Sequence, residues 1–272
     1  MYMIIAVDTG GTKTLVARLS EDGVIEQQTR FLTPRNLDEY KAVLTNTIEH
    51  LSGNARPDII VVALPGIVKN DIALWCANLE WENVDIRALL QPEFHHATIL
   101  VENDANLAGL GEAQALTVLP QCALYVTIST GIGTGVIEDG YIDPALRYSE
   151  GGHMQLEFND QVQAWERFGS GKAVYETYGK YARDINSDEI WRQIVYRFSL
   201  GFLTLIPMIQ PEVIIVGGSM GSHFGKYGDR LVGLLKEKLP PHIPCPEFRQ
   251  AAHPEEAVIY GCYHYAAQHT AS

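Results

Sequence analysis

The chain has few basic residues, no long apolar run and few cysteines, and each of these absences excludes a class of proteins. Basic residues are few: 20 Lys and Arg stand against 33 Asp and Glu, which gives a formal net charge of −13. No basic run occurs, so we expect no nucleic-acid partner. No apolar run approaches the roughly 20 residues that a membrane-spanning helix needs, so we expect no membrane span either. A chain this acidic must bind an anion locally, with backbone N–H groups, a metal ion or a few placed cations.

Cysteine is also scarce and scattered. Cys76, Cys122, Cys245 and Cys262 are widely spaced and form no CxxC pair. The pattern favours neither a disulfide framework nor a zinc cluster. The first residues lack a basic segment and a small-residue cleavage site, so they are interpreted as a strand rather than as a signal peptide. We therefore predict a cytoplasmic protein with reduced thiols.

Two similar strand–turn–strand units are present, one in each half of the 272 residues. In the first, an apolar strand at residues 4–8 leads through Thr9-Gly-Gly-Thr12 into a second strand. In the second, an apolar strand at 123–128 leads into a glycine-rich turn at 129–135. A Glu-Asp-Gly turn follows in both. The repeat predicts an internal duplication of two α/β halves that face a shared cleft.

The glycine-rich turns indicate phosphate binding. Glycine lets the main chain approach an anion closely, so several N–H groups can converge on it. One such turn is weak evidence, because hairpins also use glycine. A third cluster, Gly217-Gly-Ser-Met-Gly221, follows a predicted strand and strengthens the case. Phe168-Gly-Ser-Gly-Lys-Ala173 lacks the first Gly and the final Ser or Thr of a P-loop, so we exclude that motif.

A polar cluster, Glu102-Asn-Asp-Ala-Asn106, stands where a predicted strand at 97–101 passes into a predicted helix. In open α/β sheets, ligands bind outside the carboxyl ends of strands. The alternative is that Asp104 only caps the helix, since Asp is favoured at that position. Taken alone, this segment favours the cap.

Five segments in this order resemble the ROK-family sugar kinases, which are bacterial glucokinase-like enzymes of the actin/hexokinase superfamily. They are Asp8-Thr-Gly-Gly-Thr-Lys13, Glu102-Asn-Asp-Ala-Asn106, Ser129-Thr-Gly-Ile-Gly-Thr-Gly135, Glu150-Gly-Gly-His153 and Gly217-Gly-Ser219. Ala63-Leu-Pro-Gly66 and Asn78-Leu-Glu-Trp81 resemble two further segments of that family. The resemblance runs from the first strand to the closing helix.

The resemblance implies a two-lobed, actin-like ATPase (ribonuclease H-like) fold with ATP and sugar in a central cleft. We expect residues 1–117, completed by a C-terminal helix at about 255–272, to form the N-terminal lobe. Residues 118–254 would form a larger C-terminal lobe. The family also makes a homodimer plausible, although no sequence feature indicates one.

The resemblance assigns residues to both ligands. Contacts to the ATP phosphates are expected from Asp8, Gly10, Gly11, Thr12, Thr130, Gly131, Gly133 and Thr134. Gly217 and Gly218 would border adenosine. Sugar contacts are expected from Gly66, Asn78, Asn103, Asp104, Glu150 and His153.

One departure concerns the zinc loop that many family members carry after the glycine-histidine segment. Residues 154–166 contain no cysteine, and His153 alone cannot supply the roughly four ligands of structural zinc, so we predict no zinc site. Glu166 best matches the family's later sugar-contacting Glu, and Glu157 is the alternative.

Phosphoryl transfer depends mainly on positioning and charge stabilisation. Asp104 would accept the proton of the attacking sugar hydroxyl, which a neighbouring Asn cannot do. Asp8 would hold Mg²⁺, through water, beside the ATP phosphates. Transfer to the 6-hydroxyl of a hexose or N-acetylhexosamine is expected, with the sugar left open. The alternative is a non-catalytic, sugar-sensing regulatory protein of the same fold.

Overall fold

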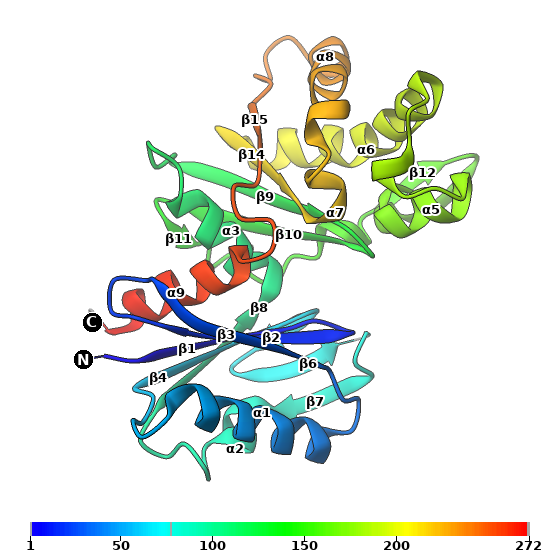
Figure 1. The fold of residues 1–272 in the computed structure, drawn as a ribbon. Helices are drawn as coiled ribbons and strands as arrows, with labels where there is room; N and C mark the ends of the chain where they lie inside the picture. Colours follow the sequence, from blue (N-terminus) through cyan, green and yellow to red (C-terminus); the bar gives the residue numbers. More distant parts are fainter. Residues whose placement is uncertain (1, 77, 271–272) are drawn as a thin grey trace. The chain divides into compact units, whose positions relative to one another are not determined.

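The computed structural model describes residues 2–76 and 78–270. The chain forms two compact units, and each has its own sheet and hydrophobic core. Unit 1 consists of Met1–Gly111 and Glu256–Ser272, and unit 2 consists of Glu112–Glu255. Figure 1 shows the elements of both units. Among the described residues, no helix has the length and apolarity to cross a membrane.

Unit 1 is built on a five-stranded sheet in the order β3-β2-β1-β4-β8. Its strands are β1 (Ile4–Thr9), β2 (Lys13–Leu19), β3 (Ile25–Leu32), β4 (Ile59–Leu64) and β8 (Thr98–Asn103). β1, β4 and β8 are parallel, whereas β2 and β3 pair antiparallel. The carboxyl ends of the three parallel strands therefore lie at one edge of the sheet.

Helices cover both faces of this sheet (Figure 1). α1 (Leu37–Ser52) and α2 (Ile86–Leu90) pack over the face that carries Val7 and Val62, and α9 (Ala257–Thr270) packs against β1 and β4. α3 (Asp104–Gln114) follows β8. Asn36 caps α1, because its side-chain oxygen accepts from two N–H groups at 3.0 Å.

A second, three-stranded sheet in unit 1 was not predicted. It joins β5 (Ile67–Lys69), β6 (Ile72–Cys76) and β7 (Trp81–Asp85) in the order β5-β6-β7. Asn70 and Asp71 occupy left-handed conformations in its first turn. The sheet matters for the site because Asn78 follows β6.

Unit 2 repeats the arrangement of unit 1, in the order β11-β10-β9-β14-β15. Its strands are β9 (Cys122–Ile128), β10 (Ile132–Glu138), β11 (Tyr141–Ile142), β14 (Val213–Gly217) and β15 (Glu247–Gln250). β9, β14 and β15 are parallel, and β10 and β11 are antiparallel. The matching order and directions support the predicted duplication. The predicted turn at 129–135 is too long, because Gly133 and Gly135 already pair with β9.

The helices of unit 2 pack on a core that includes Trp165, Phe198 and Phe202. They are α4 (Trp165–Gly169), α5 (Gly171–Tyr178), α6 (Asp188–Ile209), α7 (Gly218–Gly221) and α8 (Gly228–Lys238). Short 3₁₀ segments are η1 (Gly151–His153), η2 (Ala182–Asp184) and η3 (Phe224–Lys226). A hairpin of β12 (Gln155–Phe158) and β13 (Gln161–Ala164) precedes α4.

Candidate functional site

The carboxyl edge of the unit 1 sheet gathers three of the predicted site segments. β1, β4 and β8 are neighbours, and Asp8, Ala63 and Glu102 stand in one row across them. Neighbouring strands lie about 4.8 Å apart, so the three strand ends fall within about 10 Å. The turn after β1, Gly66 after β4 and Asp104 after β8 therefore share one edge, where α/β sheets bind ligands.

The turn between β1 and β2 is held by its own backbone. The Gly10 N–H donates to the Lys13 carbonyl at 3.0 Å, and the Thr33 hydroxyl donates to the Gly10 carbonyl at 2.8 Å. A Cβ at position 11 would lie 2.8 Å from Cβ of Asn78, so Asn78 packs directly on the turn. Thr12 is exposed at its tip.

Asp8 is a partly buried carboxylate one residue before the end of β1. Burial raises its pKa from 3.8 to about 6, and the charge of Arg30 opposes the rise only in part. Burial and the nearby Asp8 charge together raise the pKa of the Cys262 thiol on α9. A cation beside Asp8 would stabilise its ionised form. One carboxylate near the exposed Thr12 fits Mg²⁺, which takes one or two carboxylates and keeps its waters.

Gly66 and Asn103 form a fixed pair at this edge. Gly66 has φ of +90°, and a Cβ there would lie 2.2 Å from the Trp75 carbonyl oxygen, so only glycine fits. The Asn103 amide donates to the Gly66 carbonyl at 2.8 Å. The Asn103 side-chain oxygen accepts from the Asn106 N–H at 3.0 Å and so caps α3. The capping bond considered for Asp104 is thus made by Asn103.

Asp104 is the first residue of α3 and is partly exposed. Its Oδ1 lies 2.8 Å from the Ala105 N–H, a donor at the positive end of the helix. Negative charge is favoured at a helix N-terminus, so the position supports an ionised carboxylate. The residue thus combines access with charge, as a proton acceptor requires.

Glu102 is a supporting residue that the sequence reasoning missed. Its side chain is fully buried, and its Oε1 accepts from the Asn103 N–H at 2.8 Å and from the Asn106 amide at 3.1 Å. One bond holds the backbone before Asp104, and the other holds the Asn106 side chain after it. The sequence did offer one signal, because Glu102 is an acidic residue directly after an apolar run. That pattern does not show that the side chain is buried.

In unit 2, the turn between β9 and β10 lies against a carboxylate from a distant helix. The Ile132 N–H donates to Oε2 of Glu166 at 3.3 Å, and a Cβ at position 131 would lie 2.6 Å from the same oxygen. The Ser129 N–H donates to the Gly131 carbonyl at 2.9 Å, which closes the turn. Thr130 is exposed at its tip.

Glu150, His153 and Glu166 form a cluster beside this turn. The His153 ring lies 3.6 Å from both carboxylates, with Nδ1 toward Glu150 and Nε2 toward Glu166. Burial raises the pKa of Glu150; His153 opposes the rise and the Glu166 charge adds to it. Carboxylates accept hydrogen bonds and imidazole can donate or accept, so the cluster suits a ligand with several hydroxyl groups.

The glycines between Glu150 and His153 let this segment lie on β10. A Cβ at position 152 would lie 2.0 Å from the Ile132 carbonyl oxygen. The Gly151 N–H donates to the hydroxyl of Thr134, which is 5% exposed, at 3.1 Å. Thr134 therefore anchors the Glu150–His153 segment in the structure, a role that the sequence did not suggest.

Glu166, rather than Glu157, reaches His153. Glu157 is exposed on β12, where it pairs with Val162. Glu166 is carried by α4, whose first residue, Trp165, is fully buried. The Trp165 indole N–H donates to the Arg197 carbonyl at 3.2 Å, which fixes α4 against α6.

Gly217 and Gly218 lie at the end of β14, next to β9 in the sheet. Gly217 pairs with Thr127, and a Cβ at position 218 would lie 2.7 Å from the Ile128 carbonyl oxygen. The third glycine cluster is therefore at the same edge of the unit 2 sheet as the Ser129 turn.

The predicted residues thus fall into two sets, one in each unit. Unit 1 holds Asp8, Gly10, Gly11, Thr12, Gly66, Asn78, Asn103 and Asp104. Unit 2 holds Thr130, Gly131, Gly133, Thr134, Glu150, His153, Glu166, Gly217 and Gly218. Among the described residues, no three or more His, Cys, Asp or Glu side chains are grouped so that they could hold a metal ion.

Two units with the same strand order, each with a glycine turn on its first hairpin, define the actin-like ATPase fold of sugar kinases. A sequence model of the ROK family matches residues 4–269, so the chain belongs to the ROK family.

Solved structures agree with this fold along the whole chain. A ROK family glucokinase from Streptomyces griseus, in complex with glucose and AMPPNP, has a TM-score of 0.83 at 18% identity and covers 98% of this chain and 99% of its own. A ROK family protein from Streptococcus pneumoniae TIGR4, in complex with sucrose, has a TM-score of 0.84 at 23% identity, with 99% of each chain covered.

Sequence relatives include both enzymes and regulators. A fructokinase from Lactococcus lactis subsp. cremoris is 23% identical over 236 residues, which are 79% of this chain and 78% of that protein. A xylose repressor from Bacillus spizizenii is 24% identical over 185 residues, or 59% of this chain. The matches span only 48% of that repressor and 59% of a second one, from Bacillus subtilis.

Proposed function

We propose that the protein is a cytoplasmic, ATP-dependent sugar kinase that transfers the γ-phosphate of ATP to a hexose or N-acetylhexosamine, at the 6-hydroxyl. The observation that carries the proposal is the accessibility and position of Asp104. It is accessible and stands at a helix N-terminus, and the neighbouring Asn103 makes the capping bond. The phosphate-type turn after Asp8 lies at the same sheet edge. Kinases among the relatives support this choice.

In the proposed reaction, Asp104 accepts the proton of the sugar hydroxyl as that oxygen attacks the γ-phosphorus. General base catalysis of this kind contributes about 10²–10⁴-fold. Glu102 holds the backbone around Asp104, and Asn103 with Gly66 fixes the strand end, so the carboxylate is oriented before substrate arrives. Asn78 and Gly66 complete the sugar contacts of unit 1.

Unit 2 supplies the remaining sugar contacts. Glu150, His153 and Glu166 bind sugar hydroxyl groups as acceptors and donors, and Thr134 holds their loop in place. Transition-state stabilisation then depends on how well the attacking hydroxyl is positioned.

The two glycine turns and Gly217-Gly218 bind the nucleotide. Gly10, Gly11 and Thr12 contribute in unit 1, and Thr130, Gly131 and Gly133 in unit 2. Asp8 would hold Mg²⁺ through water, and the ion would neutralise charge on the ATP phosphates.

The proposal is tested by ADP release, measured with ATP, Mg²⁺ and a panel of glucose, mannose, fructose, N-acetylglucosamine and N-acetylmannosamine. We expect sugar-dependent ADP formation with at least one of them, and mass spectrometry and NMR of the product identify the phosphorylated hydroxyl. If no hexose or amino sugar raises ADP release above the sugar-free rate, the kinase proposal is wrong.

The repressor relatives support a second candidate, a sugar-sensing regulator that binds sugar without phosphorylating it. Calorimetry separates the two, because a sensor binds a sugar of the panel while ADP release stays at background.

A further inference from the structure

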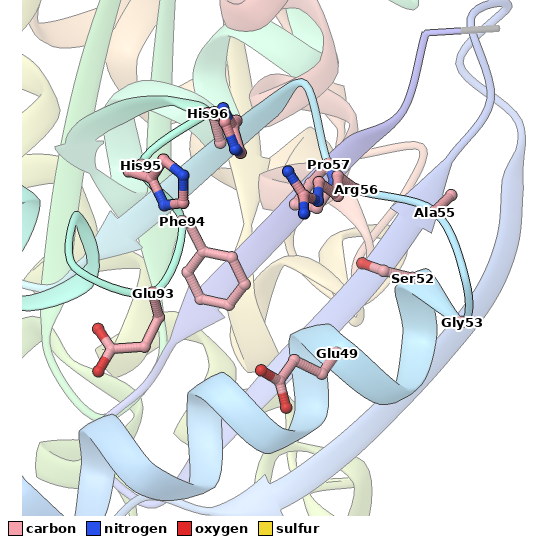
Figure 2. Close-up of a pocket in the computed structure, with 11 residues that line it drawn as sticks. Glu49, Ser52, Gly53, Ala55, Arg56, Pro57, Glu93, Phe94, His95 and His96 are labelled. Carbon is pink, nitrogen blue, oxygen red and sulfur yellow. The ribbon is translucent and has the colours of Figure 1, made fainter.

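A pocket in unit 1 lies at the amino ends of β4 and β8, whereas the candidate site residues of this unit lie at their carboxyl ends. Figure 2 shows the residues that line the pocket. It has a volume of about 200 Å³ and is formed by the end of α1, the loop before β4 and the loop before β8. Such a space holds several waters or one small solute. β8 has six residues, so the pocket lies about 20 Å from the Asp104 end.

Three basic side chains meet at this pocket in a chain of net charge −13. Arg56, His95 and His96 are exposed and line it, and Figure 2 shows Arg56 and His96 facing each other. The two imidazole rings lie with centroids 3.7 Å apart. The charge of His95 lowers the pKa of His96, and partial desolvation by neighbouring groups and the charge of Arg56 lower it further. An anion between these groups would relieve their mutual repulsion.

Two carboxylates also line the pocket. Glu93 is paired with Lys41 at 3.0 Å, so its charge is partly balanced, and Glu49 projects from α1 (Figure 2). A carboxylate repels a bare anion, yet it accepts hydrogen bonds from hydroxyl groups. The lining therefore combines a basic part with acceptors for hydroxyls.

Ser52 adds an unsatisfied hydroxyl to the lining. Its side chain is 5% exposed, and its Oγ has no hydrogen-bond partner among the described residues. Figure 2 shows this oxygen directed toward the pocket. A buried hydroxyl without a partner is destabilising, so a ligand that reaches it gains a hydrogen bond at a group already removed from water. Phe94, which is 8% exposed, forms an apolar wall.

We propose that this pocket is a second binding site, for a phosphorylated monosaccharide. Arg56, His95 and His96 would bind the phosphate. Glu49 and Ser52 would bind the sugar hydroxyl groups. A guanidinium binds phosphate oxygens in pairs, and protonated imidazoles add charged donors. The choice of a sugar phosphate rests on the proposed function, because that reaction makes such a compound.

The test is an NMR titration of the His95 and His96 rings in the Asp104→Asn variant, which blocks turnover. Signals are assigned with His95→Gln and His96→Gln. Glucose 6-phosphate, inorganic phosphate and glucose are the probes, at constant ionic strength. We expect glucose 6-phosphate to shift both rings and to raise the pKa of His96 by about one unit. It should bind at least about tenfold more tightly than inorganic phosphate, and glucose should leave the rings unchanged.

Arg56→Gln should weaken the glucose 6-phosphate effect on the rings about tenfold or more, because it removes the paired guanidinium contact. Arg192→Gln on α6, another exposed arginine, is the matched control and should leave it unchanged. Both side chains are exposed, so melting curves should show intact folding. The proposal is wrong if glucose 6-phosphate does not shift the signals of the two histidine rings, or if it shifts them equally in Arg56→Gln. If inorganic phosphate binds as tightly as glucose 6-phosphate, the pocket does not recognise the sugar.

The outcome is separable from that of the proposed function. The titration needs no turnover and reports at His95 and His96 rather than at Asp104. A protein that binds glucose 6-phosphate here but never forms ADP refutes the kinase proposal alone. If the protein phosphorylates a sugar but glucose 6-phosphate does not shift the His95 and His96 signals, only the proposal of the second site is wrong.

Discussion

The two units have the same sheet, yet they bring a carboxylate to the glycine turn by different routes. In unit 1, Asp8 belongs to the strand that enters the turn, one residue before its end. In unit 2, the corresponding position of β9 is Thr127, and the carboxylate is Glu166 from α4. The repeated backbone therefore supplies the turn in both units, whereas the chemistry depends on which side chains reach it.

This difference also separates the two turns as anion sites. Near the unit 1 turn, Asp8 is half-buried with a raised pKa, and Thr12 is exposed at the tip. At the unit 2 turn, Glu166 already accepts the Ile132 N–H, and Thr134 is committed to Gly151. The two turns have similar glycine patterns in the sequence, but they differ in which side chains are available to bind an anion. The following experiments test that difference.

The largest effect is expected from Asp104→Asn, which removes the proposed base of unit 1. The amide cannot accept the proton, so kcat should fall about 10²–10⁴-fold while affinity for a non-hydrolysable ATP analogue is retained. Steady-state ADP release and calorimetry measure the two quantities. Asp184→Asn, at an exposed aspartate of unit 2, is the control and should keep full activity. An Asp104→Asn enzyme with unchanged kcat would contradict the base assignment.

The next effect concerns Asp8 and the pH dependence of stability, without metal or nucleotide. The folded pKa of about 6 exceeds the ordinary value of 3.8, so folding disfavours the ionised form. Wild type should therefore lose stability as pH rises from about 4 to about 6, by at most about 3 kcal/mol for that shift. Asp8→Asn carries no such charge.

Thermal or urea unfolding of the two proteins checks this. Asp8→Asn should be more stable than wild type at pH 7, and the difference should shrink toward zero near pH 4. A difference that stays constant over this range would show that Asp8 has an ordinary pKa.

Glu166→Gln and Glu157→Gln form a matched pair in unit 2. The first removes a charged acceptor beside His153, so KM for the sugar should rise about tenfold or more. The second alters an exposed residue of β12 and should change KM less than about twofold. Sugar titrations in the ADP assay measure both. The reverse order of effects would transfer the sugar contact to Glu157.

Regular elements were predictable where local pattern and burial agree. The strand predicted at 4–8 differs from β1 by one residue, and the strand predicted at 123–128 differs from β9 by one residue. The hairpin of β12 and β13 was missed, although Asn159 and Asp160, both left-handed, form the type of turn that joins two strands. Its strands are only four residues long, too short to show an alternating pattern.

The sequence was sufficient to predict which segments form the candidate site, but not which contacts each of their residues makes. Asn103, Asp104 and Asn106 were recognised together, yet which of them caps α3 depends on side-chain direction. The partner of His153 depends on the packing of Trp165, which brings Glu166 back to a turn 34 residues earlier in the chain. Contacts between distant segments leave no local signal.

The smallest effects are expected from a pair of threonines, Thr134→Val in unit 2 and Thr12→Val in unit 1. Thr134→Val leaves the buried Gly151 N–H without its acceptor, which costs about 1–3 kcal/mol and lowers Tm by a few degrees. Thr12 is exposed, so Thr12→Val should change stability by less than about 0.5 kcal/mol and instead raise KM for ATP. Thr134→Ser, which keeps the hydroxyl, should restore most of the lost stability. If Thr134→Val left Tm unchanged and raised KM for ATP as Thr12→Val does, the two turns would be equivalent phosphate sites, and the contrast between the units would be wrong.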